Sequence, residues 1–343
     1  MAATIRRVTV HPDSITLTEA DKPAVQPGEV GVEMIVSGVC GSDTHAAAGH
    51  HPFVPLPYAP GHEVVGVVRD VGTDVSGVAV GDRITVEPTL PCWDRKMCRT
   101  GRSNVCENLG FFGCGYAQGG MADYFTVPAG RVHLIPAGMS DLDAALIEPL
   151  STPVHAERLS GGVNGKAVAI IGAGTIGLLM LAAARYAGAK RIVMTDVLQS
   201  KRDRAGRLGA DAVVDAASPS AVEDVRGALG ESADVVFDCV SIQSTVNQAV
   251  AITVKGGIVM IVGVPAQPVT VPLPEIQDRQ IRIQGSATYL PEDYQRAIAI
   301  IESGGVSAAD IVTAQFPLEQ AADAFAASAS GNEVKVLVTR TQR

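Results

Sequence analysis

The stretch "KAVAIIGAGTIGLLMLAAARYAG", residues 166–188, restricts the fold more than any other part of the sequence. A short apolar run leads into Gly172, Gly174 and Gly177, and an uncharged helical stretch follows. Residues 167–184 carry no charge over a span near the ~18-residue minimum for a transmembrane helix. Three glycines in the first half argue against a membrane helix. A strand, a glycine turn and a buried helix explain the stretch better.

Residues 165–284 alternate between apolar strands and helical stretches. Strand-like runs such as "RIVMTDV", "ADVVFDCV" and "GGIVMIVGV" are separated by "SKRDRAGRLG" and "STVNQAVAITV". This alternation predicts a parallel, doubly wound sheet. We therefore expect an α/β domain of the Rossmann type at residues 151–286.

The glycines have GxGxxG spacing directly after an apolar strand, which is the context of a dinucleotide-binding turn. They permit a tight turn, the approach of a pyrophosphate to N–H groups at the helix N-terminus, and close helix–strand packing. Asp196 closes the next strand, nineteen residues beyond Gly177. A carboxylate there accepts hydrogen bonds from both adenosine ribose hydroxyls and repels a 2′-phosphate, so we predict NAD rather than NADP. A glycine turn that binds another ligand is the alternative.

The N-terminal part has a different texture. From Thr4 to about Asp82, short β-branched runs such as "TIRRVTV" and "EVVGVVRDVG" are separated by Pro and Gly, which is typical of all-β structure. At 343 residues, two domains are expected. The two helical stretches and the strand "EVKVLVTR" after Tyr289 are too short for a third. We predict a first domain of residues 1–150, completed by residues 287–343.

The composition excludes several classes of protein. Six cysteines are too few for a disulfide framework, and residues 1–10 lack the apolar core of a signal peptide, so the cytoplasm fits best. A net charge of −9 without a basic cluster argues against a nucleic-acid partner. We expect no membrane partner either.

A cysteine, a histidine and a glutamate form a second chemical group. Cys40 lies in "GVCGSDTH", and His62 with Glu63 lies in "APGHEVVG". A thiolate, an imidazole and a carboxylate suit Zn²⁺, and a catalytic zinc keeps one position open for water or substrate. The wide spacing is unlike that of a zinc finger and favours a site assembled from two loops. Taken singly, each has a structural alternative, a small core thiol or a surface ion pair.

The whole chain resembles the zinc-dependent medium-chain dehydrogenases. "CGSDTH", "GHEVVGVV", "GDRI", "GGMADYF", "LIEPLSTPVHA", "GAGTIG" and the closing "KVLV" follow in the order of that family. The glutamate of "LIEPLS", Glu148, is similar to the polyol (sorbitol), butanediol and threonine dehydrogenase branch, where it replaces a cysteine ligand. The resemblance implies a GroES-like β domain beside the Rossmann domain. It also implies hydride transfer from a secondary alcohol, a polyol or vicinal diol, to NAD, giving a ketone.

The metal site implied by the resemblance contains one catalytic zinc per chain. Cys40 and His62 hold it, and Glu63 and Glu148 lie within reach, directly or through water. Which of the two carboxylates binds stays open. Asp43 orients His62 from behind.

The resemblance assigns further roles. Ser42 and His45 match a proton relay through the cofactor ribose to solvent, and histidine titrates in the range that this relay needs. Lys335 matches a basic residue behind the metal. The implied cofactor contacts are Gly172, Gly174, Thr175, Ile176, Gly177, Asp196, Lys201 and Val264.

A second cysteine cluster, in "CWDRKMCRTGRSNVC", departs from the family pattern. Three cysteines keep the register of a four-cysteine zinc lobe: Cys92, Cys98 and Cys106. Arg95 occupies the remaining ligand position, and three thiolates do not close a tetrahedral site. Either Asp94 supplies an oxygen ligand, or the lobe is metal-free and packs around Trp93. The ligand count favours the absence of a second zinc.

The substrate residues also come from the resemblance. "GFFGCGY" and "GSATYLPEDY" match segments that line the pocket of sorbitol dehydrogenases, and the implied pocket residues are Phe112, Tyr116 and Tyr289. Ala46 and Thr288 stand where those enzymes place a tyrosine and an arginine, which weakens a long-polyol assignment. A vicinal diol, a short or cyclic polyol, or a simple secondary alcohol fits as well.

Other functions on this fold stay open. An L-threonine 3-dehydrogenase needs groups for a carboxylate and an ammonium, which the sequence does not identify. A zinc-free quinone-reductase-like enzyme would lack Cys40, His62 and Glu148, and a non-catalytic sensor would lose the relay. Besides a small-molecule alcohol, we expect a homo-oligomer, a dimer or tetramer joined through the Rossmann sheet edge near "GGIVMIVGVP" and "PLPEIQ".

Overall fold

The computed structural model describes residues 3–49, 51 and 54–340, and the chain divides into two compact units. The first unit is Met1–Glu148 with Ser307–Arg343, and the second is Pro149–Val306. Residues 287–306, which we expected with the first domain, group with the second unit. There α10 (Pro291–Glu302) packs against α5 (Thr175–Tyr186).

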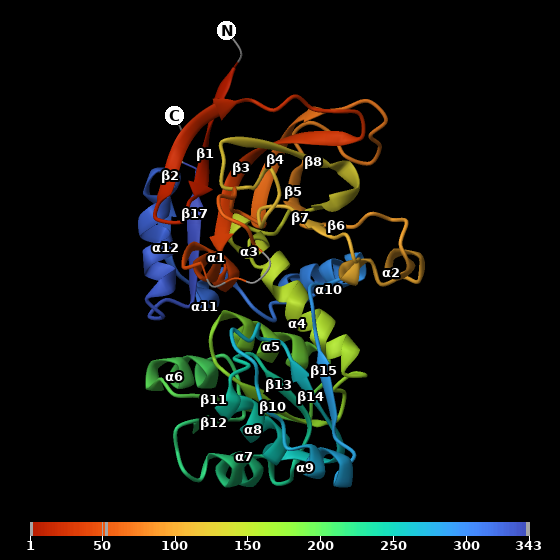
Figure 1. The fold of residues 1–343 in the computed structure, drawn as a ribbon, viewed down its shortest axis with the longest axis vertical. Helices are drawn as coiled ribbons and strands as arrows, with labels where there is room; N and C mark the ends of the chain where they lie inside the picture. Colours follow the sequence, from red (N-terminus) through yellow and green to blue (C-terminus); the bar gives the residue numbers. More distant parts are fainter. Residues whose placement is uncertain (1–2, 50, 52–53, 341–343) are drawn as a thin grey trace. The chain divides into compact units, whose positions relative to one another are not determined.

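A seven-stranded sheet forms the centre of the first unit (Figure 1). Its strands are β3 (Glu29–Val39), β4 (Glu63–Val71), β5 (Arg83–Val86), β8 (Tyr124–Pro128), β9 (Val132–Leu134), β16 (Val312–Pro317) and β17 (Lys335–Thr339). The order is β16-β17-β3-β4-β5-β9, and β8 also pairs with β3. β3 is long because residues 29–33 pair with β8 and residues 36–39 pair with β17. The C-terminal half of β3 therefore lies between β17 and β4.

Two small pairs of strands and several short helices complete the first unit. The pairs are β1 (Thr4–Val10) with β2 (Ile15–Asp21), and β6 (Thr89–Leu90) with β7 (Gly110–Phe111). The helices are α1 (Gly41–Ala47), α2 (Lys96–Arg99), α3 (Asp141–Ala144), α11 (Ala308–Ile311) and α12 (Ala321–Ala329), with 3-10 turns η1 (Ser103–Val105), η2 (Ala129–Arg131) and η3 (Leu318–Gln320). α12 packs on β16, β17 and α1. The core beneath is rich in valine from β1, β3 and β4, with Phe112, Phe125 and Phe325.

The second unit contains the parallel sheet predicted from the sequence, and the predicted fold class is confirmed. Its strands are β10 (Ala167–Ile171), β11 (Arg191–Asp196), β12 (Ala212–Asp215), β13 (Ala233–Asp238), β14 (Thr253–Ile261) and β15 (Arg282–Gly285). All neighbours are parallel, in the order β12-β11-β10-β13-β14-β15. The strand order reverses its direction between β10 and β13. Ligands of doubly wound sheets bind outside the carboxyl ends of the strands at such a point.

Helices follow the strands of this sheet in chain order. They are α5, α6 (Gln199–Arg207), α7 (Ala221–Leu229), α8 (Gln243–Ile252) and α9 (Leu273–Asp278), while α4 (Ile147–Leu159) precedes β10. Right-handed crossovers place α5 and α6 on one face and α7 and α8 on the other, and α7 packs on α8. All five residues of β10 are buried, as expected of a strand covered on both faces. Among the described residues, no helix combines the length and apolar character needed to cross a membrane.

Candidate functional site

The end of β3 and the start of β4 bring three predicted ligands together. Gly38 of β3 lies opposite Glu63 of β4 in antiparallel register. Just beyond the end of β3, Cys40 therefore lies beside His62, although residues 41–61 separate the two in sequence. The thiol sulfur, an imidazole nitrogen and a carboxylate oxygen all lie within 4.8 Å of one another. We call Cys40, His62 and Glu63 the ligand group.

Asp43 lies behind the ligand group and contacts the backbone of Cys40 and the side chain of Tyr58. Its carboxylate accepts hydrogen bonds from the Cys40 backbone N–H at 3.0 Å and from the Tyr58 hydroxyl at 2.9 Å. Oδ1 of Asp43 also lies 3.9 Å from Nδ1 of His62. Nδ1 has no hydrogen-bond partner among the described residues, whereas the imidazole does hydrogen-bond the Cys40 side chain, so Nε2 faces the sulfur. Phe111 contacts the imidazole edge-on, with ring centroids 5.7 Å apart.

The ligand group is buried, and acidic side chains lie near its imidazole. His62 is 3% exposed and Glu63 is 1% exposed. Burial alone would lower the pKa of His62, but Asp43, Cys40 and Glu148 together raise that pKa well above its usual value. Surroundings that raise the pKa of a buried imidazole stabilise positive charge. The donors, the burial and these surroundings all fit a divalent cation.

A buried ion pair holds the carboxylate of the ligand group. Lys335 Nζ pairs with Glu63 and donates a hydrogen bond to the Val39 carbonyl at 3.1 Å. Burial would lower the pKa of Lys335, but Glu63, Cys40 and Glu148 raise it, so the ammonium keeps its charge. Gly38 makes the pair sterically feasible, because a Cβ there would lie 1.8 Å from Glu63 Oε2 and 2.8 Å from Lys335 Cε.

Glu148 lies near the ligand group without joining it. It is buried in the first turn of α4 and raises the pKa of His62 through its charge. At this site, the candidate metal-ligand atoms that lie within 4.8 Å of one another among the described residues belong to Cys40, His62 and Glu63. Glu148 does not belong to this set. The geometry therefore favours Glu63 as the nearer carboxylate.

The two residues of the predicted relay lie on α1, which begins directly after Cys40. Ser42 is half-buried and His45 is exposed. His51, in the loop after α1, was given no role from the sequence. Burial lowers the pKa of His51, and the charges of His45 and His62 lower it further, so His51 lies within electrostatic reach of both. The only sequence signal for a role of His51 near the relay is its position, six residues after His45.

The structure changes the expected set of substrate residues. Phe112 has no exposed surface and packs against Phe125 in the core, with ring centroids 5.1 Å apart, so it does not line an open pocket. Its neighbour Phe111, the last residue of β7, contacts His62 instead, whereas Phe112 lies in the turn that follows. Tyr116 is exposed, whereas Tyr289 is buried in the second unit against Tyr294.

The glycine turn of the second unit has the geometry of a dinucleotide site. Gly172 follows β10 with φ +95°, a left-handed conformation that favours glycine. Gly174 is the N-cap of the twelve-residue helix α5, and Thr175 and Ile176 form its first turn. A Cβ on Gly177 would lie 1.8 Å from the Gly172 carbonyl, so only glycine lets this helix approach the strand so closely.

Asp196 ends β11 beside the glycine turn. Its carboxylate accepts hydrogen bonds from the backbone N–H groups of Ala173 and Leu198, each at 2.9 Å. Lys201 lies in the first turn of α6, and Val264 follows β14. Exposed apolar side chains cluster after the carboxyl ends of β11, β13 and β14, namely Val197, Leu198, Val240, Ile242 and Val264. Of these five residues, the sequence analysis named only Val264. The sequence signal for the other four is their position just after a predicted strand.

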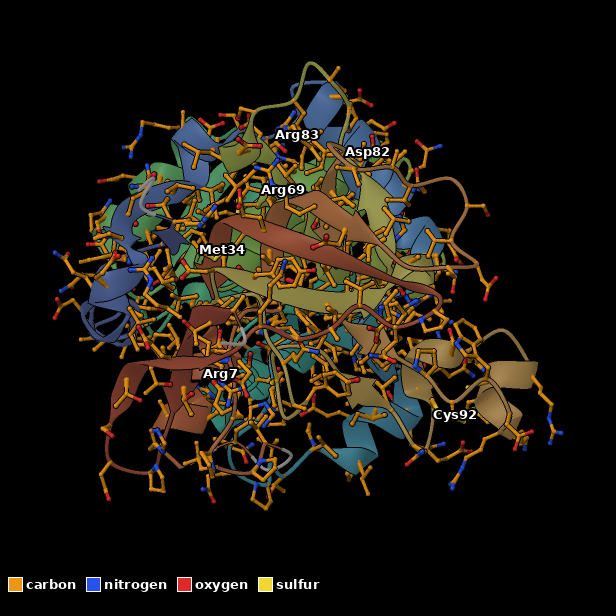
Figure 2. All side chains as sticks on the ribbon, turned by 90° about the horizontal axis from the view of Figure 1, so that it is seen from above. Arg7, Met34, Arg69, Asp82, Arg83 and Cys92 are labelled. Carbon is orange, nitrogen blue, oxygen red and sulfur yellow. The ribbon has the colours of Figure 1, made fainter. Side chains whose placement is uncertain are left out.

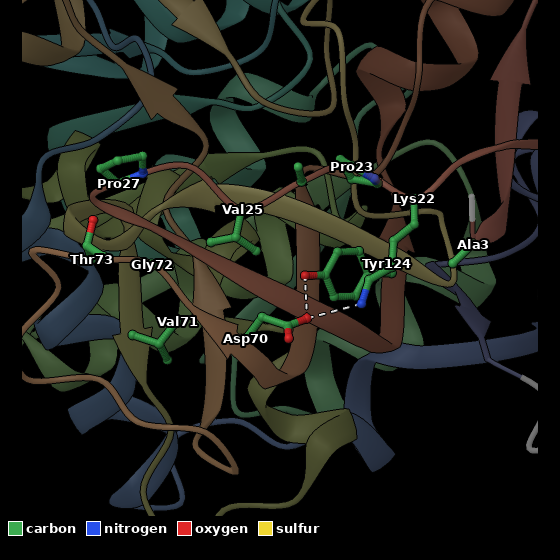
Figure 3. A pocket seen from close by; sticks show the side chains of 11 residues that line it. Ala3, Lys22, Pro23, Val25, Pro27, Asp70, Val71, Gly72, Thr73 and Tyr124 are labelled. Carbon is green, nitrogen blue, oxygen red and sulfur yellow. Dashed lines mark hydrogen bonds and ion pairs between the residues drawn. The ribbon is translucent and has the colours of Figure 1, made fainter. Parts of the chain in front are cut away.

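One hollow of the first unit lies apart from the ligand group. It measures about 640 Å³, and Lys22, Asp70 and Tyr124 are among the residues that line it (Figure 3). Asp70 accepts a hydrogen bond from the Tyr124 hydroxyl at 2.7 Å and pairs with Lys22 at 3.1 Å. These polar groups satisfy one another, so nothing in this hollow points to a ligand.

Comparison with known proteins agrees with this geometry. Residues 26–137 match the alcohol dehydrogenase GroES-like domain, and residues 175–303 match the zinc-binding dehydrogenase family. A sorbitol dehydrogenase of Arabidopsis thaliana is 35% identical over 326 residues, which cover 92% of this chain and 89% of the relative.

Two solved structures share the fold over nearly the whole chain. A zinc-binding dehydrogenase from Sinorhizobium meliloti bound to NADP has a TM-score of 0.92 and 32% identity, covering 98% of this chain and 99% of that one. The 2R,3R-butanediol dehydrogenase of Bacillus subtilis has a TM-score of 0.91 and 27% identity, covering 98% and 100%. The chain therefore belongs to the zinc-binding dehydrogenase family, in the medium-chain branch of polyol and butanediol dehydrogenases, and is an oxidoreductase of the alcohol dehydrogenase class.

Proposed function

We propose that the protein oxidises a secondary alcohol, a polyol or a vicinal diol, to a ketone, with zinc in the ligand group and NAD as hydride acceptor. The buried ligand group carries this proposal, because its three donors suit a catalytic zinc with an open position. Relatives named sorbitol dehydrogenase and butanediol dehydrogenase support the class of substrate.

The residues of the first unit would have separate roles in binding the metal and in moving the proton. When bound, zinc supplies the Lewis acidity that lowers the pKa of an alcohol, while NAD accepts the hydride. Cys40, His62 and Glu63 would hold the metal, and Glu148 would bind water or replace Glu63 during turnover. Ser42 and His45 would carry the released proton toward solvent.

The second unit would bind the cofactor through the N-terminus of α5. The N–H groups of this turn suit a pyrophosphate, and the carboxylate of Asp196 would accept the ribose hydroxyls. The relative from S. meliloti was solved with NADP, so similarity to it does not decide between NAD and NADP. The proposed preference of this chain for NAD rests on the carboxylate of Asp196 instead.

Assembly and location form a further part of this proposal. β15 is the outer strand of its sheet, all four of its residues are exposed, and Ile283 presents an apolar side chain. Pairing of this edge with a second copy would satisfy its free backbone groups. We infer a homo-oligomer, a dimer or a tetramer, in the cytoplasm, where thiol ligands stay reduced.

The proposed reaction is tested by following NADH formation with a panel of diols, short polyols and simple secondary alcohols. We expect activity with at least one of them, its loss after complete removal of metal by a chelator, and its return with Zn²⁺. Full activity without metal would favour a zinc-free reductase. No activity with any alcohol would favour a non-catalytic sensor.

Gly38→Ala should displace the Glu63 carboxylate, because the new Cβ would occupy its place. We expect the affinity for Zn²⁺ to fall by about 10–100-fold, as for other disturbed supports of metal ligands. Zinc content after dialysis measures this effect. The matched control is Gly31→Ala in the same strand, where the Cβ would meet the Tyr124 hydroxyl at 1.7 Å instead. Equal zinc loss in both variants would mean that crowding of β3, not of Glu63, is responsible.

Asp196→Ser should weaken the use of NAD and admit NADP. Loss of a hydrogen bond to a charged group predicts a decrease in kcat/KM for NAD of about 10-fold, with a gain for NADP. Asp215→Ser, at the end of the neighbouring strand β12, is the control and should leave the ratio unchanged. A wild-type protein that already prefers NADP would refute the assignment.

His45→Ala should slow alcohol oxidation mainly below neutral pH, where solvent base is scarce and a relay matters most. We expect kcat to decrease by about 100-fold near pH 6 and much less near pH 9. Steady-state rates across this range give the profile, with His11→Ala as the control histidine. An unchanged profile would remove His45 from the relay.

A further inference from the structure

Three of the five cysteines outside the ligand group, Cys92, Cys98 and Cys106, share one lobe of the first unit. This three-thiol lobe, residues 92–106, contains α2 and η1, and Figure 2 labels Cys92 within it. The pairing of β6 with β7 joins the two ends of the segment that carries it. Sγ of Cys92 lies 3.3 Å from that of Cys106 and 4.0 Å from that of Cys98. The three sulfurs all lie within 4.8 Å of one another, although nothing in the proposed reaction uses them.

Backbone N–H groups point at all three sulfurs. Cys92 accepts from the N–H groups of Asp94 and Arg95, Cys98 from that of Trp93, and Cys106 from that of Asn108 at 3.4 Å. Trp93 adopts φ +59°, a left-handed conformation within this turn. Backbone N–H groups that point at sulfur stabilise thiolates.

The basic side chains of the lobe favour three thiolates, with one cation bound between them. Residues 92–106 hold four basic side chains, Arg95, Lys96, Arg99 and Arg102, against the single acid Asp94, in a chain with a net charge of −9. The three sulfurs lie within 4.8 Å of one another, so one cation at their centre could contact all three.

A tetrahedral structural zinc does not fit this lobe. The position in register with a fourth thiolate holds Arg95, which cannot bind a cation. Asp94 does not belong to the cluster of ligand atoms found among the described residues, so it does not supply the oxygen ligand considered from the sequence. The lobe does not pack around Trp93 either, because that side chain is 59% exposed. Structural zinc sites are almost always four-coordinate.

Three thiolates without a fourth ligand suit a soft cation of low coordination number. Thiolate sulfur selects soft ions such as Cu(I), which is stable with three sulfur ligands. We propose that Cys92, Cys98 and Cys106 form a three-thiolate site for one thiophilic cation of the Cu(I) class, separate from the zinc of the ligand group. On binding, the thiols release their remaining protons, and no electron is transferred.

The test uses zinc-loaded full-length protein, titrated without oxygen with Cu(I) supplied as its acetonitrile complex. We expect one copper per chain with zinc content and dehydrogenase activity retained, and X-ray absorption of the wild-type protein should show three sulfur neighbours around copper. Cys98→Ser should lower the copper affinity by at least about 100-fold, while the control Cys239→Ser, in the second unit, should not. Copper uptake with an equal loss of zinc would overturn the proposal, because the ion would then occupy the ligand group.

Arg95→Cys supplies a second test by restoring a fourth thiolate. We expect this variant to hold about two zinc ions per chain and the wild-type protein about one. Two zinc ions in the wild-type protein would contradict a three-coordinate site. Failure of the reduced wild-type protein to bind copper under the same oxygen-free conditions would also contradict the proposal.

Discussion

A carboxylate and an ammonium, both buried, meet across the central strands of the first unit. Glu63 on β4 and Lys335 on β17 reach each other over β3, where Gly38 leaves the necessary space. A buried charge left without its partner costs about 3–5 kcal/mol, so the pair fixes the register of all three strands. Cys40 and His62 continue directly from β3 and β4, and the same register therefore sets the geometry of the ligand group.

The second unit depends on a comparable constraint of space. Gly177 lets α5 approach β10 closely, and the left-handed Gly172 turns the chain between them. Asp196 then holds the turn through the Ala173 N–H. The N-terminus of α5 and Asp196, the acid proposed to bind the ribose, are thus fixed to each other.

Much of this arrangement could be predicted from the sequence, because its signals are local. The glycine spacing and the run of apolar strands predicted the parallel sheet, and the predicted fold class is confirmed. The choice of Cys40, His62 and Glu63 followed from their chemistry and from the resemblance to a family, and the structure brings the three together. Their roles in turnover stay predictions.

The rest depends on register and long-range packing, which the sequence does not show. A shift of one residue decides that Phe111 rather than Phe112 faces His62. Likewise, no local pattern distinguishes an exposed Trp93 from a buried one. The sequence pattern gives His51 no role, because the groups that act on it in space come from α1 and from the segment before β4.

The central claim is that the ligand group binds a catalytic zinc. Anomalous diffraction at the zinc absorption edge, from crystals of the protein purified with Zn²⁺, tests it most directly. We predict one strong peak at about 2.0–2.3 Å from the Cys40 sulfur, Nε2 of His62 and a carboxylate oxygen of Glu63. Full zinc occupancy elsewhere, with Cys40 and His62 pointing away from each other, would contradict the account.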